Sequence, residues 1–259
     1  MQFQKLLFKN SRGEKLAARL DLPVDKKPAA YALFAHCFTC TKNLKALFHI
    51  NRALAQHGIA VFRFDFTGLG ESEGDFAETS FSSNVEDLIA AADFLKSDFR
   101  APQLLIGHSL GGAAVLRAAG KITSTRAVAT ISAPASLNPL AQFLRHGKET
   151  ESAEETEITL GLRTFKLKKQ FIDDLDQVQM QEVIKRLDKP LLILHSPYDE
   201  VVNVENGMEI FQSAGQPKSF ISLDRADHLL SDRNDSLYAG SVLAAWAGKY
   251  LDLPPLEGG

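Results

Sequence analysis

The sequence predicts an α/β protein with a mostly parallel, eight-stranded sheet that is flanked by helices. Short apolar runs alternate with segments of helical periodicity from Tyr31 to Tyr250, an order typical of right-handed crossovers between parallel strands. Two amphipathic runs at the N-terminus have the pattern of a hairpin, which adds an antiparallel edge. The length of 259 residues suffices for one large domain with a full core. We therefore expect residues 1–259 to form a single domain.

The predicted strands are short runs bounded by turn residues. They are Phe3–Lys9, Lys15–Leu22, Tyr31–Ala35, Ile59–Phe64, Gln103–Gly107, Ala127–Ser132, Leu191–His195 and Lys218–Leu223. The first two flank a turn of small and polar residues around Ser11 to Gly13, as in a hairpin. The run Tyr31–Ala35 is continuously apolar, which is typical of a parallel strand covered on both faces.

Helical periodicity and end signals predict the helices between these strands. They are Asn43–His57, Ser83–Asp98, Ser109–Gly120, Val204–Ala214 and Asp232–Tyr250. The first has apolar side chains at helical spacing and ends before Gly58. The second begins with a capping-box pattern, in which Ser83 is followed three residues later by Glu86.

A segment of about residues 134–189 interrupts the alternation of strands and helices. It contains a run with period two, Glu157–Leu167, which surrounds Gly161 and predicts a small β-hairpin. A helical run, Phe171–Leu187, follows it. The segment is too long for a connecting loop. We expect a small lid over the carboxyl edge of the sheet, and the alternative is a surface insertion without a role in function.

The pentapeptide Gly107–Gly111 has the pattern Gly-x-Ser-x-Gly and joins a predicted strand to a predicted helix. Such a turn forces its serine into a strained backbone, and glycines on both sides let the turn close. The Ser109 hydroxyl then projects from the sheet, and the first N–H groups of the helix point at the group that it attacks. We predict that Ser109 is a nucleophile. The alternative is a surface serine that only caps the helix.

A serine nucleophile needs a base, and the base needs an acid on its other nitrogen. Groups from different loops meet at the carboxyl ends of parallel strands. Asp199 follows the strand Leu191–His195, and His228 follows the strand Lys218–Leu223. The order Ser109, Asp199, His228 along the chain is the order expected after such a nucleophile turn. We therefore predict His228 as the base and Asp199 as the acid.

Other carboxylates and histidines are weaker candidates. Glu200 has a longer side chain for a short turn, and Asp224 and Asp227 lie in the loop of the histidine itself, where the required geometry is harder to form. His108 should point away from the nucleophile, because the turn exposes one side chain. We expect His195 to be packed and hydrogen-bonded. The remaining histidines considered have helix or lid positions without catalytic context: His49, His57 and His146.

Acyl transfer also needs backbone donors for the oxyanion, which are typically the largest electrostatic contribution. One should be the N–H of Leu110, at the start of the helix. The other should come from the loop after Tyr31–Ala35. We predict the amide of Phe38, and the alternative is that of Cys37.

Cys37 and Cys40 form a C-x-x-C pattern, which can be redox-active. The pair falls on the predicted oxyanion loop, and the sequence has no second pair of metal ligands to accompany it. We therefore favour compact packing near the site over thiol redox chemistry, and we expect no metal site.

The glycine-rich run Phe64–Gly74 superficially resembles a phosphate-binding loop. It lacks the helix start and the Lys-Ser/Thr pair of a P-loop, and its glycine spacing is not that of a dinucleotide site. We therefore predict a structural turn after the strand Ile59–Phe64.

Composition limits the classes of partner. The formal net charge of −3 gives no basic surface for nucleic acid, and 45% apolar and 24% charged residues are ordinary for a soluble globular protein. The N-terminus has no continuous apolar segment of the signal-peptide type, and the chain has no apolar span of about 20 residues. We expect a soluble, cytoplasmic protein without a membrane span, and a homodimer is compatible with the sequence.

Four segments resemble those of the α/β-hydrolase superfamily, over about residues 31–250. They are the turn Gly107–Gly111, the loop Arg63–Ser72 and the loops of Asp199 and His228. The resemblance implies the fold of that superfamily and a serine hydrolase activity. Cys37 departs from the pattern, since relatives commonly have a glycine directly after the histidine that corresponds to His36. The shape of the oxyanion loop is therefore open.

A narrower resemblance is to the hydrolase half of bacterial proteins that carry a C-terminal OsmC-like domain. It rests on His36–Cys40, Phe81–Asn84 and Ala226–Leu230. The chain ends at Gly259 without residues of such a domain. We expect either a free-standing relative or a part of a longer protein, and the peroxide chemistry of OsmC does not carry over.

These observations together predict a serine carboxylesterase that hydrolyses small carboxylic esters through an acyl-enzyme, without a metal or an organic cofactor. Fold and triad do not identify the leaving group, so a thioesterase, a peptidase or a perhydrolase remains open. Four lid residues favour an apolar acyl pocket, unless they belong to the core. They are Phe143, Leu144, Phe165 and Phe171. A non-catalytic binding module and a thiol redox protein are the alternatives from other classes.

Overall fold

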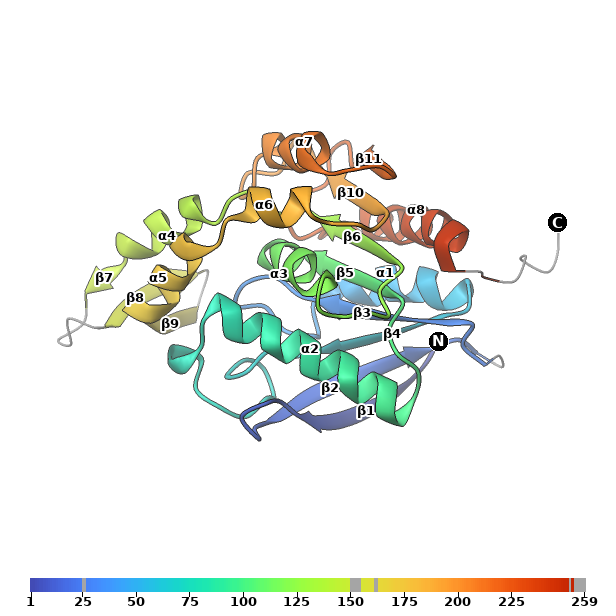
Figure 1. Ribbon diagram of the computed structural model, residues 1–259, viewed down its shortest axis with the longest axis horizontal. Coiled ribbons are helices and arrows are strands. Elements are labelled where there is room, and N and C mark those ends of the chain that lie inside the picture. The colour runs from blue at the N-terminus through green and yellow to red at the C-terminus, as the bar shows by residue number, and fades with distance from the viewer. Residues whose placement is uncertain (25–26, 150–154, 161–162, 252, 254–259) are drawn as a thin grey trace.

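The computed structural model describes residues 1–24, 27–149, 155–160, 163–251 and 253. Its central sheet consists of β1 (Gln2–Lys9), β2 (Lys15–Leu22), β3 (Ala30–Ala35), β4 (Ile59–Phe64), β5 (Leu104–His108), β6 (Ala127–Ile131), β10 (Leu191–His195) and β11 (Lys218–Ser222) (Figure 1). The order across the sheet is β1-β2-β4-β3-β5-β6-β10-β11. All strands from β4 to β11 in this order run parallel, whereas β2 pairs antiparallel with both β1 and β4. The prediction of a mostly parallel sheet with an antiparallel edge is confirmed.

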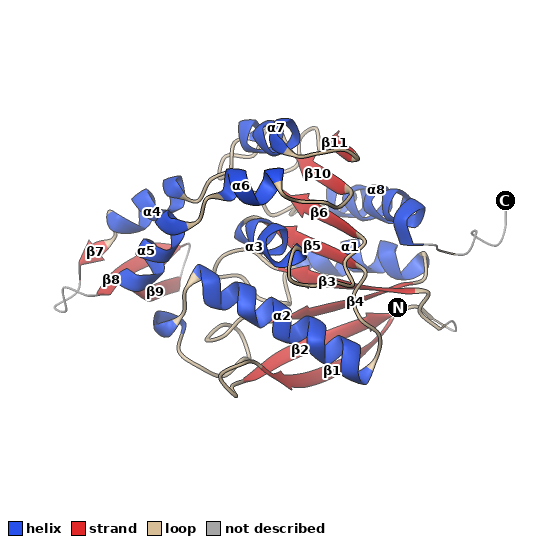
Figure 2. Cartoon of the chain, in the orientation of Figure 1, coloured by secondary structure: helices blue, strands red, loops and turns tan. Residues whose placement is uncertain are grey.

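Helices cover both faces of the sheet (Figure 2). They are α1 (Lys45–Gln56), α2 (Phe81–Asp98), α3 (Leu110–Ala119), α7 (Val204–Ser213) and α8 (Arg233–Leu251), with the short 3-10 helix η1 (Phe76–Glu78) before α2. Helix α1 packs against α8 on one face, and α2 packs against α3 on the other. Within the described part of the chain, no helix has both the length and the apolarity that crossing a membrane requires.

The sheet separates two apolar cores, because successive side chains of a strand point to opposite faces. Leu105 of β5 belongs to the core that contains α2 and α3. Its neighbours Leu104 and Ile106 belong to the core that contains α1 and α8. Every residue of β5 is buried, which explains its apolar sequence. The turn after β5 therefore stands on a rigid strand in the middle of the sheet.

Helix α2 begins at Phe81, two residues earlier than Ser83, the predicted start. Ser80 is the N-cap, and its hydroxyl accepts a hydrogen bond from the Ser83 amide at 3.0 Å. The Ser83 hydroxyl in turn accepts one from the Ser80 amide at 2.9 Å. The capping box therefore exists, but Ser83 takes the place that Glu or Gln usually holds. Phe81, the first residue of α2, is fully buried, so the first turn of this helix packs in the core.

The segment between β6 and β10 contains helices and a second sheet, all of which are described except for two short gaps. Its elements are α4 (Asn138–Arg145), β7 (Lys148–Glu149), β8 (Glu155–Leu160), β9 (Arg163–Lys168), α5 (Lys169–Gln177) and α6 (Met180–Lys185). Strands β8 and β9 pair antiparallel, which confirms the predicted hairpin. Its Gly161 lies outside the described residues.

Two expectations for this insertion are corrected. The single helix predicted over Phe171–Leu187 is wrong, because Val178 adopts an extended backbone with ψ of 111° and separates α5 from α6. Helix α4 was not predicted. It begins with Pro139 in its first turn, where the missing N–H of proline costs no hydrogen bond.

Candidate active site

Ser109 lies in the turn between β5 and α3. Its φ of 55° and ψ of −126° form a backbone that a residue other than glycine adopts only under strain. A Cβ atom on Gly107 would lie 2.2 Å from the carbonyl oxygen of Gly111, and one on Gly111 would lie 2.4 Å from that of His36. The turn therefore closes only with glycine at both positions, and it places Ser109 at the carboxyl edge of the sheet.

Ser109, His228 and Asp199 form a line of hydrogen-bonded side chains. Nε2 of His228 lies 3.1 Å from Ser109 Oγ. Nδ1 of His228 lies 2.9 Å and 3.0 Å from the two carboxylate oxygens of Asp199. Because an ionised carboxylate only accepts, Nδ1 carries the hydrogen and Nε2 is left to accept from the serine. The structure thus brings together the three side chains that were selected from the sequence.

Asp199 is held by the turn that follows β10. The amides of Val201 and Val202 each donate to Asp199 Oδ1 at 2.9 Å. Burial by itself raises the pKa of Asp199, but hydrogen bonds from His228 and from the Val202 amide outweigh it and lower the pKa to about 2. The carboxylate is therefore ionised at neutral pH and suited to orient an imidazole and to balance a positive charge on it.

Among the described residues, none of the competing carboxylates makes a hydrogen bond with the ring of His228. Glu200, Asp224 and Asp227 are all exposed. The Asp227 carboxylate accepts a hydrogen bond from the amide of Ser231 at 2.7 Å, so it holds its own loop. This placement agrees with the preference for Asp199.

Two further histidines contact the loops of the site. His195 is buried, and its Nε2 lies 2.7 Å from the carbonyl oxygen of Val202, which agrees with the packed residue expected. His108, which was expected to point away from the nucleophile, contacts the proposed base instead, which was not predicted. Its ring lies 4.9 Å from that of His228, and its Nε2 lies 2.7 Å from the His228 carbonyl oxygen, so the end of β5 contacts the loop after β11. The others lie in or directly after helices: His49, His57 and His146.

The residues that carry the two predicted oxyanion donors line one small cavity. Leu110 is the first residue of α3, so its amide has no acceptor within the helix. The amide of Phe38, in the loop after β3, donates to no acceptor among the residues that the structure describes. Both residues line a cavity of about 10 Å³. This arrangement is compatible with an oxyanion hole made of two backbone amides.

Cys37 and Cys40 are joined by a disulfide bond, which was not predicted, and their Cα atoms lie 5.3 Å apart. Within this turn the Cys40 amide donates to the Cys37 carbonyl at 3.2 Å, and Thr39 has a φ of 60°. Phe38 lies inside the closed turn. The disulfide therefore restricts the backbone that carries the predicted donor.

A buried ion pair holds the far end of the same loop. Nζ of Lys42 lies 2.6 Å from Asp65 Oδ2, and the Lys42 amide lies 2.6 Å from Asp65 Oδ1. A Cβ atom on Gly70 would lie 2.2 Å from the Asp65 carboxylate. Glycine at this position leaves room for the carboxylate, as expected if the glycine-rich run is a structural turn after β4. The link between Asp65 and Lys42 of the oxyanion loop was not predicted from the sequence. The available signal was Asp65 directly after a buried strand, where a carboxylate requires a partner.

Aromatic rings join the insertion to the predicted oxyanion loop. The ring of Phe171 in α5 lies 5.6 Å from that of Phe38. The ring of Phe76 in η1 lies 5.7 Å from Phe38 and 5.7 Å from Phe165 of β9. These four rings, called the aromatic cluster below, pack side chains of the insertion against the predicted oxyanion loop. Phe143, in contrast, is mostly exposed.

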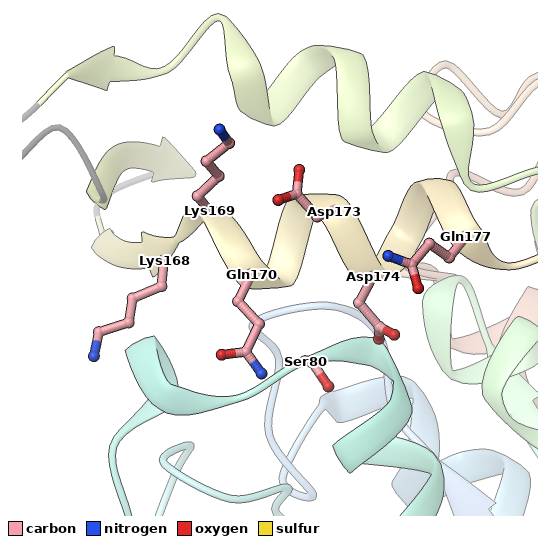
Figure 3. A pocket seen from close by; sticks show the side chains of 7 residues that line it. All are labelled: Ser80, Lys168, Lys169, Gln170, Asp173, Asp174 and Gln177. Carbon is pink, nitrogen blue, oxygen red and sulfur yellow. The ribbon is translucent and has the colours of Figure 1, made fainter.

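The outer side of this contact is polar. The amide and hydroxyl of Ser82 donate to Asp174 at 2.6 Å and 2.7 Å, and Lys168 pairs with Glu78. A cavity of about 670 Å³ lies between α5 and the start of α2, and Figure 3 shows the side chains that line it. Its lining residues are Ser80, Lys168, Lys169, Gln170, Asp173, Asp174 and Gln177. None of the predicted catalytic side chains lines this cavity.

Comparison with known proteins identifies relatives over most of the chain. A family model described as "Serine aminopeptidase, S33" matches residues 26–147, which include Ser109. Among solved structures, the esterase domain from a Rhodothermus marinus protein is 50% identical. The alignment covers 97% of this chain and 100% of that one, with a TM-score of 0.80.

More distant relatives share the fold. Est1E from Butyrivibrio proteoclasticus, solved with ferulic acid bound, is 20% identical over 95% of this chain and 99% of that one, with a TM-score of 0.84. The mitochondrial palmitoyl-protein thioesterase ABHD10 of Mus musculus is 26% identical over 192 residues. This match spans 69% of the present chain and 62% of the length of the mouse protein.

Proposed function

The chain belongs to the α/β-hydrolase superfamily and is a serine hydrolase, and from this premise we propose that it is a carboxylesterase for small carboxylic esters. The observation that carries the proposal is the line of hydrogen bonds from Asp199 through His228 to Ser109, with 3.1 Å between His228 Nε2 and Ser109 Oγ. The similarity to the Rhodothermus marinus esterase domain supports an ester as the substrate.

In the first half of the proposed reaction, Ser109 Oγ attacks the carbonyl carbon of the ester while His228 Nε2 takes the hydroxyl proton. The imidazolium that forms lies against the ionised carboxylate of Asp199, which stabilises its positive charge. His228 then gives the proton to the leaving alkoxide as the C–O bond breaks. An acyl group remains on Ser109.

The tetrahedral intermediate places a negative charge on the former carbonyl oxygen. In this proposal the amides of Leu110 and Phe38 donate to it. Both donors are oriented before substrate binds, since Leu110 begins a helix and Phe38 lies within the disulfide turn. Water then attacks the acyl-enzyme with His228 again as the base, and the carboxylic acid is released.

The aromatic cluster supports an apolar acyl group of modest size. Phe38 brings one of the four rings to the predicted oxyanion loop, and Phe165 and Phe171 come from the insertion. The rings of Phe171 and Phe76 lie 5.6 Å and 5.7 Å from that of Phe38, and this close packing leaves little room for a long acyl chain beside the predicted oxyanion loop. We therefore propose short acyl chains, with the insertion at residues 134–189 acting as a lid over the site.

Ser109→Ala tests the proposal with p-nitrophenyl acetate as the substrate. We expect kcat/KM to fall by at least about 10³-fold, because the nucleophile is lost. A fluorophosphonate probe should label the wild type and not this variant. The control is Ser97→Ala, an exposed serine in α2, which should retain wild-type activity. Hydrolysis at the wild-type rate by a folded Ser109→Ala protein would reject the mechanism.

A thioesterase is the second candidate, and the similarity to the mouse palmitoyl-protein thioesterase favours it. The same side chains would act, with a thiolate as the leaving group. A chain-length series of p-nitrophenyl esters and the matching acyl thioesters separates the two candidates. Higher kcat/KM for thioesters at every chain length would replace the esterase proposal.

A further inference from the structure

Three buried histidines stand at the carboxyl edge of the sheet in addition to the predicted base. His36 directly follows β3, His108 is the last residue of β5 and His195 is the last residue of β10. Their exposed fractions are 1%, 3% and 0%. One ring nitrogen of each lies within hydrogen-bond distance of a backbone carbonyl oxygen. The other is buried and has no hydrogen-bond partner among the described residues.

We infer that His36, His108 and His195 are positioning residues, each held as a single neutral tautomer that fixes one loop of the catalytic site. The inference rests on the proposed function, because these loops carry the groups to which that function assigns roles. A carbonyl oxygen only accepts, so the ring nitrogen that faces it carries the hydrogen. The tautomer is therefore Nδ1–H for His36 and Nε2–H for His108 and His195.

His36 orients the oxyanion loop. Its Nδ1 donates to the carbonyl oxygen of Cys37 at 2.8 Å. In a planar trans peptide the C=O and the following N–H point in opposite directions. Holding the Cys37 carbonyl on one side therefore turns the Phe38 amide to the other side, where the oxyanion is proposed to form. The His36 ring also packs against Phe66, with 4.9 Å between centroids.

His108 holds the backbone of the proposed base. Its Nε2 donates to the carbonyl oxygen of His228 at 2.7 Å, and the two rings lie 4.9 Å apart. Burial lowers the pKa of His108 to about 3, so the ring is neutral when His228 takes up a proton. A second positive charge at this distance would oppose the imidazolium that the reaction forms.

His195 holds the turn that carries the proposed acid. Its Nε2 donates to the Val202 carbonyl at 2.7 Å, and the Val202 amide donates to Asp199 Oδ1 at 2.9 Å. The distance from Nε2 to Asp199 Oδ2 is 3.8 Å, too long for a hydrogen bond. His195 thus acts on the carboxylate through the turn. A Cβ atom on Gly207 would lie 2.7 Å from His195 Nδ1, so α7 leaves room for this ring only with glycine there.

The tautomers can be read directly from the wild-type protein. Two-dimensional ¹H–¹⁵N spectra that correlate ring nitrogens with ring carbon-bound protons distinguish Nδ1–H, Nε2–H and charged imidazoles. With the signals assigned to individual residues, we expect the set of His36 to be of the Nδ1–H type and those of His108 and His195 to be of the Nε2–H type at neutral pH. A charged ring or the opposite tautomer at any of the three would overturn the assignment for that residue. This measurement is independent of catalytic activity.

Amide side chains test the positioning role, because the NH₂ group of Asn stands near the place of Nδ1 and that of Gln near the place of Nε2. The matched variants are His36→Asn, His108→Gln and His195→Gln. The mismatched variants are His36→Gln, His108→Asn and His195→Asn. We expect each mismatched variant to lose about 10- to 100-fold in kcat with little change in KM, because misplacement of a catalytic group by about 1 Å has effects of this size. Each matched variant should recover most of that loss.

The control is His146→Gln, which replaces an exposed histidine that bonds the Gln142 carbonyl and should leave kcat unchanged. Equal loss of kcat in matched and mismatched variants of equal thermal stability would show that the rings only fill space. Full activity in every mismatched variant would also reject the inference. If Ser109→Ala retained wild-type activity, the proposed function would fail by itself, and the spectra would still test the tautomers.

Discussion

Lys42 and Asp65 form a buried ion pair that ties the predicted oxyanion loop to the glycine-rich turn, with 2.6 Å between Nζ and Oδ2. Their side chains are 5% and 1% exposed. Arg63 donates to the Lys42 carbonyl, and Glu71 also pairs with Nζ from a largely exposed position. Since Cys40 is only two residues before Lys42, this pair and the disulfide together hold both ends of a short segment.

Asp65→Ala should destabilise the protein by about 3–5 kcal/mol, because the buried ammonium of Lys42 then keeps only the exposed Glu71 as a partner among the described residues. Urea unfolding of the wild type and of Asp65→Ala measures the difference in the free energy of unfolding. Lys185→Ala is the control, since Lys185 and Glu182 form an exposed pair at 3.6 Å, whose loss should cost no more than about 0.5 kcal/mol. A cost for Asp65→Ala as small as that of the control would show that the pair contributes little to the fold.

Asp199→Asn should lower kcat by about 10³- to 10⁴-fold while leaving the protein folded, because the amide cannot enforce the His228 tautomer or balance its positive charge. The matched control is Glu200→Gln, which neutralises the adjacent, exposed carboxylate and should change kcat less than about twofold. Steady-state hydrolysis of p-nitrophenyl acetate measures both. If Glu200→Gln were the impaired variant, the proposed acid would be the wrong residue.

Acid should destabilise the folded chain through His108. The ordinary pKa of histidine is 6.5, and burial lowers that of His108 to about 3 in the folded protein. Between these values the unfolded chain binds a proton that the folded chain does not, so the free energy of unfolding falls as pH decreases from 6.5. The slope from this group approaches about 1.4 kcal/mol per pH unit.

Urea unfolding of the wild type and His108→Gln at several pH values between 4.5 and 7.5 measures this contribution. The variant should show a shallower loss of stability below pH 6.5 and a parallel curve above it. Burial also lowers the pKa of His36 and His195, so part of the slope should remain in the variant. The same slope in both proteins would mean that His108 is protonated in the folded state.

The strands and the three side chains of the proposed triad could be predicted because each depends on local pattern or on chain order. Ser109, Asp199 and His228 all follow apolar strand segments, and parallel strands bring their carboxyl ends to one edge. The break between α5 and α6 could not be predicted in this way. Val178 fits a helical pattern, and only its tertiary surroundings impose the extended backbone.

The roles of His108 and of the cysteines also depended on contacts between distant segments. The bond from His108 to His228 joins residues 120 positions apart, so no local pattern reports it. The Cys37–Cys40 disulfide requires a turn in which Thr39 adopts a left-handed backbone, which is uncommon for threonine. The C-x-x-C spacing alone is equally compatible with free thiols.

Removal of that disulfide should lower both stability and turnover. The combined change Cys37→Ser and Cys40→Ser frees a loop of about four residues, which the chain-entropy estimate values at about 2 kcal/mol. The Phe38 amide then loses one of the constraints on its direction. Since loss of an oxyanion donor costs about 10²- to 10³-fold, a loosened donor should cost less, about 10-fold in kcat.

Treatment with a dithiol reductant should have the same effect on the wild type, because Cys40 is partly exposed and its sulfur can be attacked. The serine variant is the control, as it should be insensitive to the reductant. Esterase assays and urea unfolding before and after reduction measure the two effects, with thiol titration to confirm that the bond is open. Unchanged kcat in fully reduced protein would show that His36 and the Lys42–Asp65 pair hold the Phe38 amide without help from the disulfide.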